Sequence, residues 1–270
     1  MPSRAYLWLT PPRPDEPAVL DAPARRGYVP EIVLVFAVSL GLSGVRSLLS
    51  LLNALLRPRG LSHQSVALNV SQSAQSLLDL AFQLTDVVQL LAWGGLGVYL
   101  LWRSGILPRV IGLDGRRPWR DAGGGALLAA GIGVPGLGLY LAARALDLNL
   151  TVQPTTLADH WWRVPVLVLS AAGNAWAEET LVVGYLGTRL RQFGMRENGS
   201  LLVSTVLRGS YHLYQGFGGF VGNLVMGMIF CRVWQRTNRL WPLVVAHTLL
   251  DVAAFVGYAL LHGHVSWLPG

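Results

Sequence analysis

Long apolar segments alternate with short polar loops along most of the chain. A helix needs about 20 apolar residues to cross about 30 Å of hydrocarbon. The segments that reach or approach this length are 31–56, 78–102, 122–146, 164–189, 199–214, 217–235 and 240–261. The pattern predicts an all-α fold, a polytopic transmembrane bundle of about seven spans. An eighth span or a re-entrant piece between residues 60 and 76 stays open.

The ends of the chain are more polar than its middle. Residues 1–29 are rich in proline and charge and lack the continuous apolar core of a signal peptide. We expect them to form a flexible cytoplasmic tail. Residues 30–262 then form the transmembrane bundle, and residues 263–270 form a short C-terminal tail.

Composition supports a membrane protein. The chain has 270 residues, of which 52% are hydrophobic and 13% are charged, whereas soluble domains carry about 25% charged residues. All 21 basic residues are arginine. Their place in short loops between apolar segments argues against a nucleic-acid partner despite the pI of 10.2. The single cysteine, Cys231, excludes an internal disulfide and a cysteine-based metal site.

The arginines predict an orientation, because cytoplasmic loops of membrane proteins are enriched in basic residues. With the N-terminus inside, four loop arginines fall outside: Arg57, Arg59, Arg144 and Arg163. The remaining fifteen loop arginines then lie inside: Arg4, Arg13, Arg25, Arg26, Arg103, Arg109, Arg116, Arg117, Arg120, Arg189, Arg191, Arg196, Arg232, Arg236 and Arg239. This bias predicts an integral membrane protein with a cytoplasmic N-terminus, and we expect the membrane to be a bacterial plasma membrane.

Three of the predicted spans carry titratable residues. Glu178 and Glu179 are adjacent within 164–189, His212 ends the fifth span, and the last span holds His247 and Asp251. A charged side chain at membrane depth costs at least a few kcal/mol, so it normally faces a protein interior or a wet cavity. We therefore expect an active-site cavity between these helices.

Their depths agree with one shared site. Counted from the arginine-rich ends of the spans, Glu178 lies about 11 residues in and His212 about 14. His247 lies about 8 residues in and Asp251 about 12. At about 1.5 Å per residue, these depths are roughly 16, 21, 12 and 18 Å. Residues four apart share a helix face, which places His247 beside Asp251.

Two further charges lie at a common depth in the first two spans. Arg46 and Asp86 are predicted to form a structural ion pair, and a cavity-lining role for Asp86 is the alternative.

The three polar segments, in this order, resemble the CPBP family of intramembrane endopeptidases, the CAAX-processing and bacteriocin-processing or ABI proteins. The first family motif is a Glu-Glu pair followed by three residues and an arginine, and Glu178 and Glu179 match the pair. In the second motif, three residues separate a phenylalanine from a histidine, which His212 matches. In the third motif, three residues separate a histidine from an asparagine or aspartate, and His247 and Asp251 match it. The resemblance covers residues 160–262, which would form the catalytic core.

Two positions depart from the family motifs. Val183 replaces the arginine of the first motif, and Arg208 replaces the phenylalanine of the second. We hypothesise that Arg208 supplies the cation that the first motif has lost. The alternative is a degraded site.

The resemblance implies roles for these residues. Glu178 would act as general base with His212 as its partner, activating a water molecule. His247 and Asp251 would stabilise the oxyanion and place the substrate, with Asp251 orienting His247 or staying protonated. Glu179 would bond to neighbouring helices. We expect no cofactor and no bound metal, although a zinc ion held by Glu178, His212 and His247 is the alternative.

The predicted function is therefore an intramembrane endopeptidase that hydrolyses a peptide bond of a membrane-associated or lipidated protein near the cytoplasmic leaflet. A catalytically degraded member that binds a partner or confers immunity to a peptide toxin is the first alternative. A proton-coupled transporter is the second, although no inverted repeat is visible. The expected partners are the substrate polypeptide and the lipid bilayer.

Overall fold

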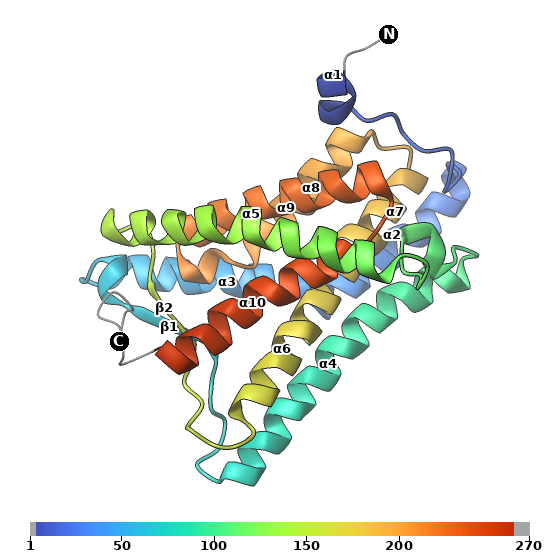
Figure 1. Cartoon of the computed structure of the whole chain (residues 1–270). Helices are drawn as coiled ribbons and strands as arrows, with labels where there is room; N and C mark the ends of the chain where they lie inside the picture. Colours follow the sequence, from blue (N-terminus) through green and yellow to red (C-terminus); the bar gives the residue numbers. More distant parts are fainter. Residues whose placement is uncertain (1–3, 262–270) are drawn as a thin grey trace.

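The computed structural model describes residues 4–261 and is dominated by helices (Figure 1). Its helices are α1 (Arg4–Leu9), α2 (Ala22–Ala37), α3 (Leu40–Leu55), α4 (Ser76–Arg103), α5 (Pro118–Ala145), α6 (Arg163–Glu178), α7 (Leu186–Gln192), α8 (Glu197–Ser210), α9 (Phe217–Thr237) and α10 (Trp241–Leu261). A π-helical segment, Glu179–Tyr185, joins α6 to α7. The predicted helical bundle is confirmed.

Five helical segments are long and apolar enough to cross a membrane. They are Ser76–Arg103, Pro118–Ala145, Arg163–Gln192, Phe217–Thr237 and Trp241–Leu261. The pair α2 and α3, bent by 50°, makes a sixth if it counts as one broken span. Many large apolar side chains on these helices are exposed, such as Leu49 on α3, Val88 on α4 and Val134 on α5. Such a surface suits contact with lipid.

The predicted span at 199–214 is shorter than expected. The segment forms α8, a helix of 14 residues, which at about 1.5 Å per residue covers only about 21 Å. Its C-terminal end turns through a 3₁₀ segment, Leu213–Gln215, into α9. The structure therefore supports five or six spans rather than seven.

Residues 60–76 form neither an eighth span nor a re-entrant helix. They contain a short 3₁₀ turn, Leu61–His63, and the strand β1 (Ser65–Asn69). This strand pairs in parallel with β2 (Thr151–Thr155), with Ser65 opposite Thr151. The two strands connect the ends of helices that belong to different parts of the bundle.

The N-terminal segment packs against the bundle beside α7. The backbone N–H of Leu20 donates to the carbonyl of Gln192 at 2.9 Å, and the side chain of Arg13 donates to the carbonyl of Arg191. The side chain of Asp21 caps α2 by accepting from the N–H of Ala24. The predicted C-terminal tail, residues 263–270, lies outside the described residues.

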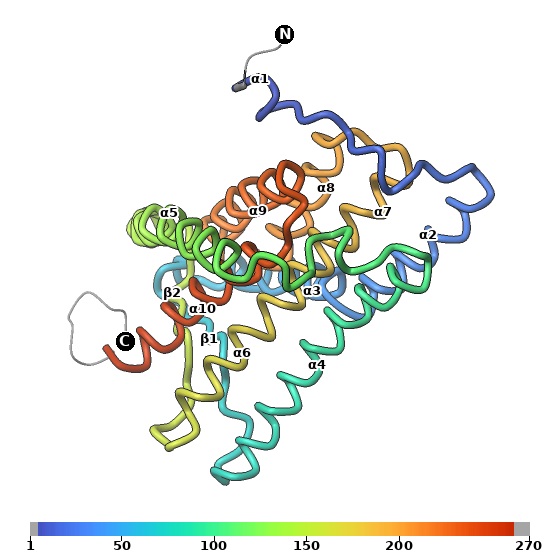
Figure 2. Tube along the Cα trace, turned by 45° about the vertical axis from the view of Figure 1, so that its right-hand side comes forward, coloured from blue at the N-terminus to red at the C-terminus, as the bar shows by residue number. Residues whose placement is uncertain are grey.

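The helices form two layers that diverge towards one end of the molecule (Figures 1 and 2). Helices α4 and α6 pack against each other in one layer, α8 packs against α9 in the other, and α10 packs against both α5 and α6. Figure 1 shows that α4 and α6 separate from α3 and α5 towards the end where β1 and β2 lie. The fold is therefore a wedge, with the strands across its wide end.

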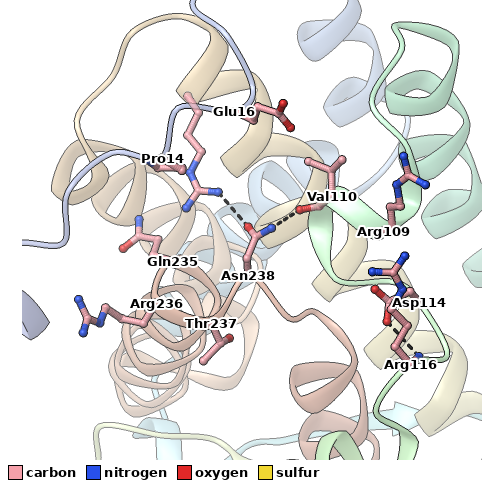
Figure 3. Close-up of a pocket in the computed structure, with 11 residues that line it drawn as sticks. Pro14, Glu16, Arg109, Val110, Asp114, Arg116, Gln235, Arg236, Thr237 and Asn238 are labelled. Atoms are coloured by element: carbon pink, nitrogen blue, oxygen red, sulfur yellow. Dashed lines mark hydrogen bonds between the residues drawn. The ribbon is translucent and has the colours of Figure 1, made fainter.

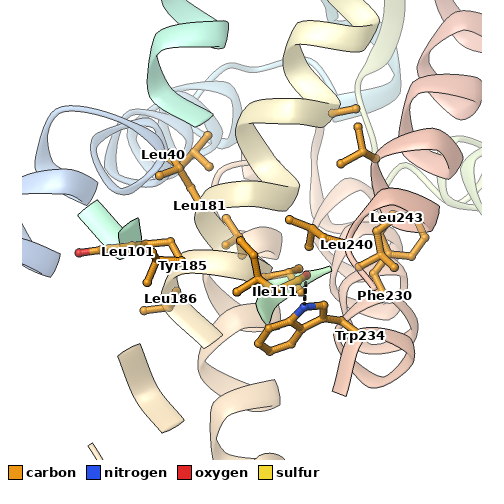
Figure 4. Packing of buried hydrophobic residues seen from close by; sticks show 14 of the residues in the cluster. Leu40, Leu101, Ile111, Leu181, Tyr185, Leu186, Phe230, Trp234, Leu240 and Leu243 are labelled. Atoms are coloured by element: carbon orange, nitrogen blue, oxygen red, sulfur yellow. Dashed lines mark hydrogen bonds between the residues drawn. The ribbon is translucent and has the colours of Figure 1, made fainter. Parts of the chain in front are cut away.

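A large apolar cluster fills the narrow end of the wedge (Figure 4). Leu181 and Tyr185 of the π-helical segment lie in this cluster with Leu240 and Leu243, and each is at most 1% exposed. Trp234 joins them and donates its Nε1 proton to the carbonyl of Ile111 at 3.1 Å. This cluster locks the helix ends together around the polar residues described next.

Candidate active site

Glu178 and Glu179 lie where the helix of the fourth predicted span changes its winding. Glu178 is the last residue of α6, and the π-helical segment begins at Glu179. A π-helical turn is rare and often marks a functional site, because it shifts the side-chain directions that follow it. The exposed fractions of Glu178 and Glu179 are 3% and 0%. Each carboxylate faces a different set of partners.

Glu178 lies between a tyrosine and a histidine. The hydroxyl of Tyr211 donates to its Oε2 at 2.8 Å, and Nε2 of His212 lies 3.9 Å from its Oε1. Within the described residues, Nε2 of His212 is buried and has no hydrogen-bond partner. One water molecule can hydrogen-bond to both atoms at this separation. The arrangement suits a carboxylate and an imidazole that share a water.

Glu179 belongs to a second, drier cluster. Its Oε1 lies 2.6 Å from Nη2 of Arg208 and 2.8 Å from Nδ1 of His247. Nη1 of Arg208 also lies 3.7 Å from Oε2 of Glu178. Charge-assisted contacts of this kind are the strong class of hydrogen bonds. Arg208 therefore neutralises charge on both glutamates, and Glu179 links α10 to the π-helical segment.

Asp251 reaches the same region from α10. Its Oδ2 accepts a hydrogen bond from Nδ2 of Asn174 at 2.9 Å and lies 3.6 Å from Nε2 of His247. The resemblance implied that Asp251 orients His247 or stays protonated. The shorter contact to the imidazole comes instead from Glu179, because Glu179 faces Nδ1 from the opposite side of the ring.

All the candidate residues named from the sequence therefore meet in one place. Two of their partners, Tyr211 and Asn174, were not predicted. Asn174 precedes Glu178 by four residues, so the same-face rule could have indicated it. Tyr211 directly precedes His212, but neighbours in sequence do not share a helix face. Its contact depends on the end of α8 at Ser210, which the sequence did not reveal.

The candidate residues line a cavity of about 640 Å³. Glu178, His212, His247 and Asp251 lie in its wall. Gln83, Leu90 and Trp93 of α4, Leu40 and Ser43 of α3, and residues 68–70 and 72 complete much of the lining. The predicted cavity between helices is present, and it extends from Glu178 towards the strands.

Arg46 and Asp86 do not form the predicted ion pair within the described residues. Asp86 accepts a hydrogen bond from Nε2 of Gln72 at 2.7 Å and lines the cavity. The shared depth was a weak guide, because a depth does not fix the direction of a side chain around its helix. The cavity-lining alternative for Asp86 describes its place.

Glu178, His212 and His247 do not converge as a zinc site would require. Among the described residues, no three His, Cys, Asp or Glu side chains are arranged to hold a metal ion. A catalytic zinc needs three protein ligands that converge on one point. The proposed chemistry therefore has no step that passes through a metal.

A second cavity, of about 520 Å³, lies at the opposite, arginine-rich end (Figure 3). Arg109, Arg116 and Arg236 line it together with Glu16 and Asn238. The side-chain amide of Asn238 donates to the carbonyl of Val110 and ties α9 to the loop before α5. None of the candidate catalytic residues reaches this cavity, so it is a surface feature of the loop end.

Comparison with known proteins identifies the part of the chain that carries the site. The family model described as type II CAAX prenyl endopeptidase Rce1-like matches residues 160–253. A search of curated proteins found no match, and a search of solved structures found none either. The matched segment holds all three motifs and covers about a third of the chain. This match supports the assignment to the CAAX protease family that the motifs indicated.

Proposed function

We propose that this chain, which carries an Rce1-like domain at residues 160–253, is an intramembrane endopeptidase with Glu178 and His212 as its water-activating pair. The proposal is carried by one observation: Nε2 of His212 lies 3.9 Å from Oε1 of Glu178, and both residues line a cavity with room for water. The substrate is a membrane-associated or lipidated polypeptide. The protein is an integral protein of a bacterial plasma membrane, with its N-terminus in the cytoplasm.

The reaction begins with a water held between Glu178 and His212. Glu178 removes a proton from this water as its oxygen bonds to the substrate carbonyl carbon. The carbonyl oxygen becomes an oxyanion, and the imidazolium form of His247 donates to it from Nε2. The C–N bond then breaks as Glu178 returns the proton to the leaving nitrogen. The products are a carboxylic acid and an amine, and no further reactant is needed.

The remaining residues hold this pair in position. The Tyr211 hydroxyl occupies Oε2 of Glu178, which leaves Oε1 facing His212. Glu179 holds His247 through Nδ1, so that Nε2 points towards the cavity side and Asp251. Arg208 compensates the two glutamates in place of the arginine that the family motif has at position 183. Preorganised contacts of this kind keep the reacting groups aligned.

The alternative is a partner-binding protein that has lost catalysis. Val183 is its specific support, because it removes the motif cation. The position of Arg208 weakens this alternative, since its guanidinium contacts both carboxylates.

Cleavage by the purified protein tests the proposal. Membrane-anchored peptides, in matched prenylated and unprenylated forms, would be incubated with the wild type, Glu178→Gln and Glu197→Gln. Glu197 is also a buried carboxylate paired with an arginine, but it lies outside the cavity. We expect Glu178→Gln to lower the rate by about 10²–10⁴-fold, the usual contribution of a general base, while Glu197→Gln keeps cutting.

Chelator provides a second arm of the same experiment. Activity that survives chelation supports activation of water by Glu178 and His212, whereas activity restored only by added zinc would overturn it. A folded wild type that binds a peptide but never cuts any would favour the partner-binding alternative.

A further inference from the structure

The bundle closes the candidate site on its arginine-rich side. Directly after Glu179, the side chains of Leu181, Val182 and Val183 are at most 1% exposed. Leu240, just before α10, and Leu243, in its first turn, are fully buried and belong to the same apolar cluster (Figure 4). A polypeptide therefore has no path to Glu178 through this end without unpacking that cluster.

The cavity opens in the other direction. On α6, its lining residues Ser170 and Asn174 precede Glu178 and so lead towards the strand end. On α4, Gln83 and Asp86 lie near the helix start, and the lining continues to Asn69 and Gln72 before that helix. These polar residues line the strand end of the cavity, which we call its rim. The two layers of the wedge diverge towards that end (Figure 1). The sequence predicted cleavage near the opposite leaflet.

The structure also separates the loop arginines between the two ends. Arg57, Arg59, Arg144 and Arg163 lie next to the strand-end termini of α3, α5 and α6. The other end carries loops before α5, after α7 and after α9 that hold most of the remaining loop arginines, including those of Figure 3. Because basic loops stay in the cytoplasm, the strand end is the extracytoplasmic end.

The lining indicates what the cavity accepts. Its ionisable side chains are Glu178, Asp86 and Asp251 with the two histidines, and no arginine is among the described lining residues. Apolar residues such as Leu40, Leu90 and Phe255 also line the cavity. An acidic peptide is disfavoured by these carboxylates, whereas a neutral or basic segment is compatible with them.

We infer that the substrate reaches Glu178 from the extracytoplasmic side, as a neutral or basic polypeptide segment that enters at the rim formed by Asn69, Gln72 and Asp86. Cleavage of the entering segment rests on the proposed function. The direction from which the segment enters does not depend on it.

Cysteine labelling tests the access direction without requiring activity. The native Cys231 is fully buried, so an introduced cysteine dominates the signal. Single variants Gln72→Cys at the rim, Ser170→Cys inside the cavity and Arg116→Cys at the arginine-rich end would be expressed in cells. Intact and permeabilised cells would then be treated with a small, charged, membrane-impermeant thiol reagent.

We expect the reagent to modify Gln72→Cys and Ser170→Cys in intact cells, and Arg116→Cys only after permeabilisation. A synthetic neutral or basic peptide that slows modification of Ser170→Cys from outside would place the polypeptide in the cavity. The inference is overturned if Ser170→Cys reacts only after permeabilisation, or if Arg116→Cys reacts in intact cells. Failure of cleavage together with external labelling would instead count against the proposed function alone.

Discussion

Nη2 of Arg208 lies 2.6 Å from Oε1 of Glu179, and its Nη1 lies 3.7 Å from Oε2 of Glu178. Arg208 stands at the motif position that usually holds phenylalanine, while Val183 stands at the arginine position. The guanidinium of Arg208 on α8 therefore contacts the two glutamates. In the family motif, the cation comes instead from an arginine one helical turn after the pair. The contact explains how the chain accommodates two buried carboxylates without the usual arginine.

Exchange of these two residues tests the compensation. Arg208→Phe leaves Glu179 without its cation, and breaking a buried ion pair costs about 3–5 kcal/mol. We expect a large drop in the temperature of unfolding and a loss of cleavage of roughly 100-fold, equivalent to about 2.7 kcal/mol. The double variant Val183→Arg/Arg208→Phe restores the family arrangement and should recover part of both. Full activity in Arg208→Phe would refute the compensation.

Removal of the Tyr211 hydroxyl should affect the rate more than substrate binding. Tyr211→Phe keeps the buried ring but frees Oε2 of Glu178, and a hydrogen bond to a charged group contributes about 1.5–3 kcal/mol. We expect kcat to fall roughly 10- to 100-fold with KM nearly unchanged. Tyr214→Phe is the matched control, because Tyr214 lines the same cavity but its hydroxyl accepts from Gln215 instead. Equal effects in both variants would argue against a positioning role for Tyr211.

Two of the buried carboxylate–arginine pairs among the described residues should separate stability from catalysis. Glu179 pairs with Arg208 in the site, whereas Glu197 pairs with Arg191 at 3.0 Å outside the cavity. We expect both Glu179→Gln and Glu197→Gln to lower the unfolding temperature, since each leaves an arginine only partly compensated. Below that temperature, only Glu179→Gln should lose cleavage, because it also releases His247. A Glu197→Gln protein that is folded but inactive would contradict this separation, because a pair outside the cavity would then also be needed for cleavage.

The sequence predicted the site better than it predicted the path of the helices. Glu178, His212 and His247 could be placed at one depth because straight helices rise by a constant amount per residue. The π-helical winding after Glu178, the early end of α8 and the bend between α2 and α3 depend on packing between segments far apart in the chain. Hydropathy therefore gave about seven spans where the described residues hold five or six candidates, and a shared depth wrongly paired Arg46 with Asp86.

Asp251 should tolerate replacement by the asparagine that the family motif also allows. Its Oδ2 accepts from Asn174, and the amide oxygen of an asparagine at position 251 can accept the same bond. We expect Asp251→Asn to keep activity within about threefold, a change of less than about 1 kcal/mol. Asp251→Leu removes the acceptor from Asn174 and should lower the rate by at least about 10-fold. Steady-state cleavage by the two variants, compared at equal folded fraction, measures the difference. If Asp251→Asn is as inactive as Asp251→Leu, the negative charge itself is required, and Asp251 acts on the imidazolium of His247 rather than through hydrogen bonding alone.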